Sequence, residues 1–217
     1  MLIYRKLIPL KLGMALNLRM ALAALLGAAM LLPGPALAQF SDGYKFLEAV
    51  RKRNDADLQK LFVQGGPNLV NTRDQTSLDT GLHIAARQKN LRYITFLIAA
   101  GANVNLRNSN GETALVIASN LGFIEAVPAL IAAGARIDES NSTGETPLIT
   151  AVHNRSIAMM RMLLLAGADP DRTDNSGRSA RDYAKLDVKS VSLLAEIKAS
   201  AKPKPKPGQG PKVFGPK

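Results

Sequence analysis

The sequence contains no cysteine and only two histidines, His83 and His153. The absence of cysteine excludes disulfides, thiolate metal sites, a cysteine nucleophile and a lipid-modified N-terminal cysteine. Two histidines leave little basis for a histidine zinc site or a catalytic triad. The chain also lacks a glycine-rich phosphate loop, and its acidic residues do not have EF-hand spacing. This composition argues against an enzyme and predicts neither a cofactor nor a metal.

Positive charge is concentrated at the two ends of the 217 residues. The net charge is +11, of which residues 1–38 contribute four and residues 201–217 contribute five, with no acidic residue in either segment. The part between them therefore has a net charge of only +2. The high isoelectric point reflects the two ends, so it is a poor argument for a nucleic-acid partner.

Long apolar runs are scarce, and the one at Met20–Leu32 is 13 residues long. A bilayer span needs roughly 20 apolar residues, whereas the core of a signal peptide is shorter. Basic residues precede the run, and small residues at Ala36 and Ala38 suit a signal peptidase. We therefore expect cleavage between Ala38 and Gln39. The alternatives are a buried core helix, an uncleaved anchor, or a start at Met14 or Met20.

A leader of this type without a lipid-acceptor cysteine looks bacterial and predicts a periplasmic or secreted protein. No apolar run long enough to span a bilayer follows in the sequence. Stable membrane insertion after cleavage is therefore not expected.

One sequence motif recurs along the rest of the chain. "GETALVIASN" begins at Gly111, and "GETPLITAVH" begins at Gly144, 33 residues later. Other positions also keep their residue type at this step: Thr80, Thr113, Thr146 and Ser179; Leu82, Leu115 and Leu148; Ala85, Ala118, Ala151 and Ala184; Gly101, Gly134 and Gly167. A period of this length indicates repeated structural units that bury their apolar faces against one another.

The segments "TGLHIAA" (80–86), "LIAAGANVN" (97–105), "TPLITA" (146–151) and "LLLAGADPD" (163–171) closely resemble the ankyrin repeat family. The resemblance covers about residues 42–200. It implies an all-α repeat solenoid, in which each 33-residue unit contains a β-turn and two antiparallel helices. Together with the leader, it suggests a likeness to exported, periplasmic bacterial ankyrin repeat proteins.

The predicted organisation has three parts: a cleaved signal peptide (1–38), an ankyrin repeat domain (39–200) and a disordered basic Lys/Pro-rich tail (201–217). The domain divides into a cap at about 42–74, repeats at about 75–107, 108–140 and 141–173, and a C-terminal cap at about 174–200. The N-terminal cap fits at a 36-residue offset, so three extra residues must lie in a loop between Gly65 and Thr80. The tail either aids solubility or acts as an electrostatic tether.

Several residue types suit specific places in such units. Thr146 can cap a helix with its hydroxyl, and Pro147 fits the first helical turn. Gly167 can end a helix in the left-handed conformation. Gly81 replaces the proline, which predicts a weaker helix start, and Pro128 is tolerable only within a first turn.

The resemblance implies a concave binding surface made by the turns and the inner rims of the first helices, which we name the turn–rim surface. Its fourteen candidate partner-binding residues are Ser77, Asp79, Arg87, Gln88, Asn110, Glu112, Asn120, Leu121, Thr143, Glu145, His153, Asn154, Ser176 and Arg178. We expect their side chains to make no packing contacts within the fold and to be mostly polar, without an aromatic anchor. This predicts a modest, reversible interface. The alternative is that the variation at these positions is only drift at an exposed surface.

Three functions remain open at this point. The favoured one is a monomeric, non-enzymatic scaffold that binds a protein partner of unknown identity. The second is an envelope tether that acts through the basic tail. The weakest is an enzyme built on Ser77, His83 and Asp79, because His83 occupies the ankyrin position at which histidine holds the turn through hydrogen bonds.

Overall fold

The computed structural model describes residues 42–65, 67–187 and 191–201, so the predicted signal peptide and residues 202–217 of the predicted tail lie outside the described residues. Within these ranges the chain forms helices joined by loops, with one isolated β-bridge between Thr173 and Ser179. The helices follow in pairs: α2 (Asp42–Lys52) and α3 (Asp55–Gly65), α4 (Gly81–Arg87) and α5 (Leu91–Ala99), α6 (Ala114–Asn120) and α7 (Ala126–Ala132), α8 (Pro147–His153) and α9 (Ile157–Ala166), and α10 (Ala180–Leu186) and α11 (Val191–Ser200). The all-α repeat prediction is therefore confirmed.

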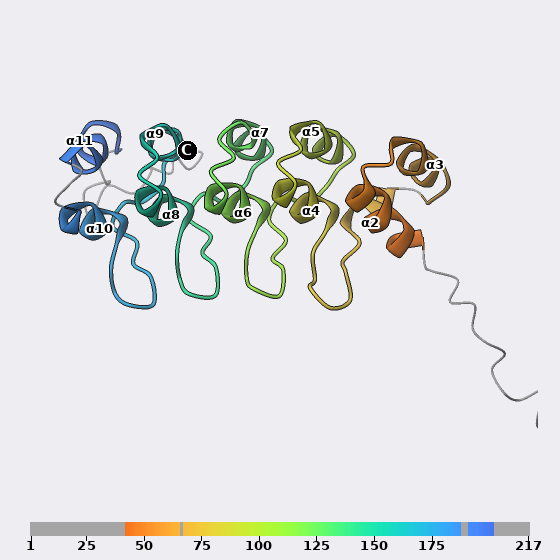
Figure 1. Cartoon of the computed structure of the whole chain (residues 1–217), viewed down its shortest axis with the longest axis horizontal. Helices are drawn as coiled ribbons and strands as arrows, with labels where there is room; N and C mark the ends of the chain where they lie inside the picture. The colour runs from red at the N-terminus through yellow and green to blue at the C-terminus, as the bar shows by residue number, and fades with distance from the viewer. Residues whose placement is uncertain (1–41, 66, 188–190, 202–217) are drawn as a thin grey trace, which may run out of the picture. The chain divides into compact units, whose positions relative to one another are not determined.

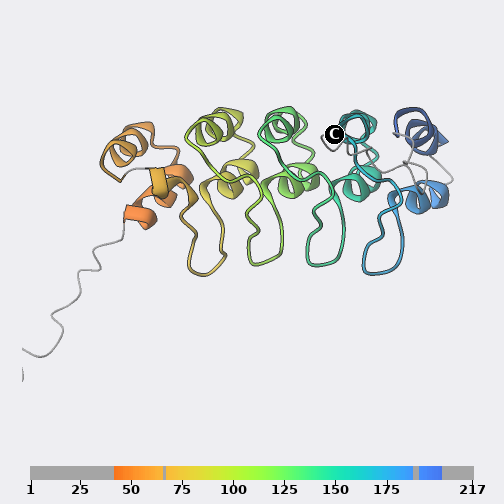
Figure 2. The same cartoon turned by 180° about the vertical axis from the view of Figure 1, so that it is seen from behind.

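The five pairs stack side by side in sequence order (Figure 1). The first helices α2, α4, α6, α8 and α10 form one row, and each contacts the next. The second helices form another row, and the long loops between pairs project from the opposite side of the first-helix row (Figure 2). The chain thus presents two different exposed sides, one made by loops and first-helix ends and the other by second helices.

The first helices approach closely because each has alanine at the contact. Ala85, Ala118 and Ala151 are fully buried, and Ala184 is nearly so. Because alanine adds only a methyl group, neighbouring helices can pack at short distance around the buried leucines. No unit could bury its apolar face alone, so stability comes from the stack.

The helix starts agree with the prediction for Thr146, whose hydroxyl accepts a hydrogen bond from the backbone N–H of Ile149, with Pro147 in the first turn. Gly81 does not move the start of its helix, because α4 begins at the same repeat position as α6 and α8; whether this start is weaker stays a prediction. A side chain at Gly81 would meet the Phe46 ring at 3.2 Å, so close packing on the N-terminal cap accounts for the glycine.

The two ends depart from the repeat as predicted. The longer loop between Gly65 and Thr80 contains the short 3-10 helix η1 (Pro67–Asn71). At the other end, Arg181 stands where the other units have leucine, and its Nε donates to Asp171 Oδ1 at 2.7 Å. Pro128 is the third residue of α7, within the first turn, where its missing N–H costs no helical bond.

Left-handed backbone occurs after the second helices and in the turns. Gly167 has φ 104° after α9, as predicted, and the turn glycines Gly111, Gly144 and Gly177 have φ between 72° and 82°. In the first turn the same place is taken by Leu78, with φ 55°. A side chain in this conformation costs energy, so the first turn is less favourable than the other three.

Candidate binding surface

The turns are fixed by hydrogen bonds that repeat from unit to unit. Asn108 Oδ1 accepts from the backbone N–H groups of Asn110 and Glu112, and Asn141 and Asp174 do the same in their turns. Neighbouring turns are also joined by one backbone bond each: Ser109 to Ser77 at 2.9 Å, Ser142 to Asn110 at 3.0 Å, and Asn175 to Thr143 at 3.1 Å. The backbone of the turns is therefore held by one repeated Asn or Asp side chain and by bonds between neighbouring turns.

The turn–rim surface is largely accessible. Nine of its fourteen candidate residues are exposed: Arg87, Asn110, Asn120, Leu121, Thr143, His153, Asn154, Ser176 and Arg178. Four are half-buried: Ser77, Gln88, Glu112 and Glu145. Asp79 is only 5% exposed and offers a partner no contact, so its inclusion in the surface was wrong.

Asp79 is buried because it joins two units. Its carboxylate forms an ion pair with Arg87 and accepts a hydrogen bond from Asn108 at 3.1 Å. Arg87 also reaches Glu112 at 3.5 Å, so one guanidinium contacts acids of two successive turns. Burial opposes ionisation of Asp79, but the bonds from Arg87 and Asn108 lower its pKa overall. Arg87 therefore has a structural role, contrary to the expectation that these side chains are free of packing duty.

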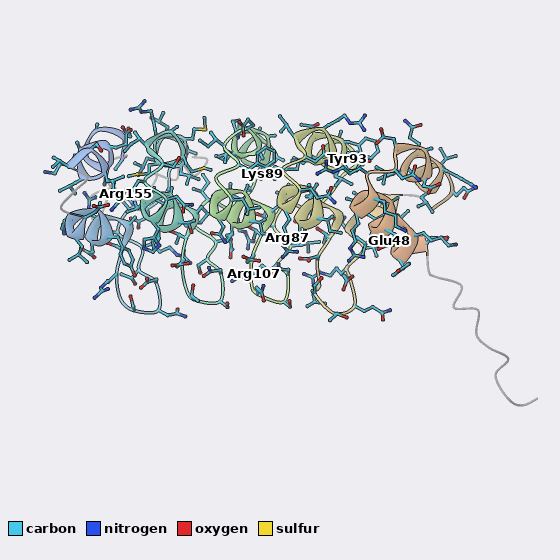
Figure 3. All side chains as sticks on the ribbon, in the orientation of Figure 1. Glu48, Arg87, Lys89, Tyr93, Arg107 and Arg155 are labelled. Atoms are coloured by element: carbon cyan, nitrogen blue, oxygen red, sulfur yellow. The ribbon has the colours of Figure 1, made fainter. Side chains whose placement is uncertain are left out.

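Amide side chains make similar links between the first helices. Gln88 Nε2 donates to the Arg51 carbonyl at 2.8 Å. Further along, Asn120 Oδ1 accepts from the Thr150 hydroxyl at 3.1 Å, and Asn154 Nδ2 donates to the Asn120 carbonyl at 3.4 Å. Figure 3 labels Arg87 between the first-helix row and the turns. Polar residues of the rim thus bind neighbouring units as well as facing solvent.

The last two units contain an aromatic group that the sequence reading missed. The rings of His153 and Tyr183 pack edge to face with centroids 4.4 Å apart, and Glu145 Oε1 lies 3.5 Å from His153 Nδ1. The Tyr183 hydroxyl donates to Asp174 Oδ2 at 2.6 Å. Burial alone would raise the pKa of Asp174, but hydrogen bonds from Tyr183, from the Ser176 hydroxyl and from backbone N–H groups lower it to about 2. The expectation of a surface without an aromatic anchor was therefore wrong at this end.

Tyr183 was missed because its position in the other units holds Ile84, Ile117 and Thr150, which give no aromatic signal. The sequence signal for this ring was a tyrosine four residues after the capping Ser179 in the terminal unit. The Tyr183 ring packs against His153 of the preceding unit, a contact between units that the repeat pattern does not show.

His83 is part of the turn, as the resemblance implied. Its Nδ1 accepts from the Thr80 backbone N–H at 3.0 Å, and its Nε2 lies 2.9 Å from the Glu112 carbonyl. Burial lowers its pKa. The Ser77 hydroxyl instead accepts from the Asp79 N–H at 3.3 Å, so Ser77, His83 and Asp79 do not form a triad.

Within residues 42–65, 67–187 and 191–201, no group of three or more His, Asp or Glu residues is arranged to hold a metal ion. No helix in the same ranges is long and apolar enough to cross a bilayer.

Comparison with known proteins agrees with this geometry. The family model "Ankyrin repeats (3 copies)" matches residues 46–141, 82–174 and 117–203. Similar curated proteins include a probable E3 ubiquitin-protein ligase of Oryza sativa subsp. japonica, 33% identical over 89 residues (41% of this chain, 17% of the relative). A putative ankyrin repeat protein of Acanthamoeba polyphaga mimivirus is 34% identical over 70 residues (32% and 9%). Ankyrin repeat and SOCS box protein 11 of Mus musculus is 51% identical over 41 residues (19% and 13%).

The chain therefore spans less than a fifth of the length of each of these relatives. The family model covers more than half of the chain, in register with the five stacked helix pairs. The chain belongs to the ankyrin repeat family.

Proposed function

We propose that the chain is an exported, non-enzymatic scaffold that holds a protein partner on its turn–rim surface. The observation that carries this proposal is the contrast between a repeated, hydrogen-bonded backbone and exposed side chains that differ from unit to unit. Such a surface can display different side chains for a specific partner while its backbone stays the same. Ankyrin repeats suggest protein binding, and the polar character of most of these residues favours a reversible interface.

Export to the bacterial periplasm is part of the proposal. Its support is the order of basic residues, the apolar run Met20–Leu32 and the small residues before Gln39. Intact-mass analysis of the exported protein should find a chain that begins at Gln39. A chain that retains Met1, Met14 or Met20 would rule out this part of the proposal.

The binding surface is tested by substitutions that leave the inter-unit network intact. Leu121 is 40% exposed, and the Asn110 side chain makes no hydrogen bond to another described residue. The variant carrying Asn110→Lys and Leu121→Lys should keep its melting temperature and lose the partner captured from a periplasmic extract. The matched control is Ala132→Lys, on the exposed second-helix side, which should retain capture.

The alternative function, an electrostatic tether, makes a different prediction. Capture that survives Asn110→Lys with Leu121→Lys, but disappears when residues 201–217 are deleted, would assign the function to the tail. Such an interaction should also weaken steeply as ionic strength rises, because exposed charges are screened by salt.

A further inference from the structure

The fourth turn reverses a charge pattern that the first three share. In those three, the residue before the capping threonine is an acid that contacts the polar side chain eight residues later: Asp79 with Arg87, Glu112 with Asn120, and Glu145 with His153. In the fourth turn the acid is replaced by Arg178, and the residue eight positions later is Leu186. Leucine offers no polar group, so the intramolecular contact of the other turns cannot form here.

Arg178 is therefore left with a charge that nothing in the described chain neutralises. Its side chain is exposed, and no carboxylate of a described residue forms an ion pair with it. Asp174 of the same turn accepts hydrogen bonds from the hydroxyls of Tyr183 and Ser176 at 2.6 and 2.7 Å, and no ion pair joins it to Arg178. The Arg178 guanidinium instead lies over the Tyr183 ring, 5.9 Å from its centroid.

Apolar surface lies beside this cation. Tyr183 and Leu186 are three residues apart on α10, which places them on the same side of the helix. Leu186 is 62% exposed, although it is a large apolar residue. The arginine Arg155, by contrast, is paired, since its Nε lies 2.6 Å from Asp187 Oδ2.

We propose that Arg178, Tyr183 and Leu186 bind a peptide segment of the partner in which a carboxylate stands next to an apolar or aromatic side chain. The guanidinium would hold the carboxylate through charge-assisted hydrogen bonds, and Tyr183 and Leu186 would cover the apolar group. Tyrosine and arginine are the residue types that dominate binding energy at protein interfaces. This inference rests on the proposed function and assigns the strongest contact to the C-terminal end of the turn–rim surface.

The test is selection of a displayed library of short random peptides against the full chain. The expected result is enrichment of peptides with Asp or Glu beside an apolar or aromatic residue. A synthetic copy of the most enriched peptide should bind about tenfold more weakly to Arg178→Gln, which corresponds to about 1.4 kcal/mol. Changing the acid of that peptide to its amide should have the same effect, and the two changes together should weaken binding no further.

The matched control is Arg172→Gln, because Arg172 is also exposed but no aromatic ring of a described residue forms a cation–π contact with it. The inference is overturned if no peptide is enriched, if enriched peptides lack an acid, or if the two arginine variants weaken binding equally. A partner that is released by Asn110→Lys with Leu121→Lys but not by Arg178→Gln would overturn this inference and leave the proposed function standing. A partner whose binding is unaffected by Asn110→Lys with Leu121→Lys and by Arg178→Gln would overturn both this inference and the proposed function.

Discussion

Asp138 accepts a hydrogen bond from the backbone N–H of Asp169, with its carboxylate oxygens at 3.0 and 3.3 Å from that nitrogen. At the corresponding places in earlier units, Asn71 and Asn105 accept the same kind of bond and also donate one to the carbonyl of Gly101 or Gly134. An ionised Asp138 has no proton to donate, so the third link lacks the second bond of the first two.

The first prediction is that Asp138→Asn stabilises the chain by about 1 kcal/mol near neutral pH, because the new amide can donate to the Gly167 carbonyl. Burial raises the pKa of Asp138 overall, although the hydrogen bond from the Asp169 backbone N–H and the charge of Arg172 lower it; the Asp169 carboxylate adds slightly to the rise. A carboxyl whose pKa is raised by folding destabilises the fold increasingly as pH rises through that pKa. The stability difference between variant and parent should therefore shrink as pH falls, which chemical denaturation at several pH values would measure.

The control for this prediction is the reverse change, Asn105→Asp. It should lower the free energy of unfolding at neutral pH, because it removes the donor to Gly134 and adds a charge at the same kind of site. Equal stability of both variants and the parent at every pH would contradict the account.

The second prediction concerns Arg87. Replacing it with alanine should lower the free energy of unfolding by about 1–3 kcal/mol, because the buried Asp79 carboxylate would lose its counter-ion. Thermal melts would show the loss. Adding Asp79→Asn should recover part of it, since the remaining group is then neutral. If Arg87→Ala alone melts like the parent, the ion pair does not join the units.

The third prediction tests the contact between first helices. Ala151→Leu should overpack the fully buried space between α8 and its neighbours and cost about 1–3 kcal/mol. Ala118→Leu should behave in the same way. Ala132→Leu, at an exposed position of α7, should leave the melting temperature nearly unchanged. A similar loss in all three variants would show that the repeat register is wrong.

The fourth prediction uses the link between the two helices of a unit. Arg53, Lys89 and Arg155 have φ between 50° and 56° there, whereas the third unit has Gly122 with φ 63°. Lys89→Gly should stabilise by up to about 1 kcal/mol, because glycine avoids the left-handed penalty but loses more entropy on folding. Gly122→Ala should destabilise. Urea denaturation of both variants would measure the two effects, and effects of the same sign would contradict the explanation.

The repeated part of the fold could be predicted from the sequence because each repeated residue has the same physical task in every unit. Thr113 and Thr146 both cap a helix, and Ala118 and Ala151 both fill a helix contact, so one spacing predicted all four. The left-handed Leu78 was not predicted, since leucine gives no sign of a positive φ. It was identifiable only by its alignment with Gly111.

The candidate surface was predictable in position but not in its contacts. The period located the turns and the ends of the first helices, yet it cannot show which polar side chains bind each other. The contact of Arg87 with Glu112, like that of Arg161 with Glu196, joins residues of different units and is not repeated elsewhere in the described stack. Such contacts depend on side-chain reach across the stack, which a one-dimensional pattern does not contain.

The bonds between neighbouring turns have a consequence for how the surface can change. Ser109, Ser142 and Asn175 donate through the backbone N–H, and the acceptors are backbone carbonyls. Any residue except proline has that N–H, so nineteen of the twenty amino acids can preserve the bond at each donor. Mutation can therefore change the side chains at the turns one residue at a time while the fold is kept. Binding specificity can then evolve through intermediates that all remain folded.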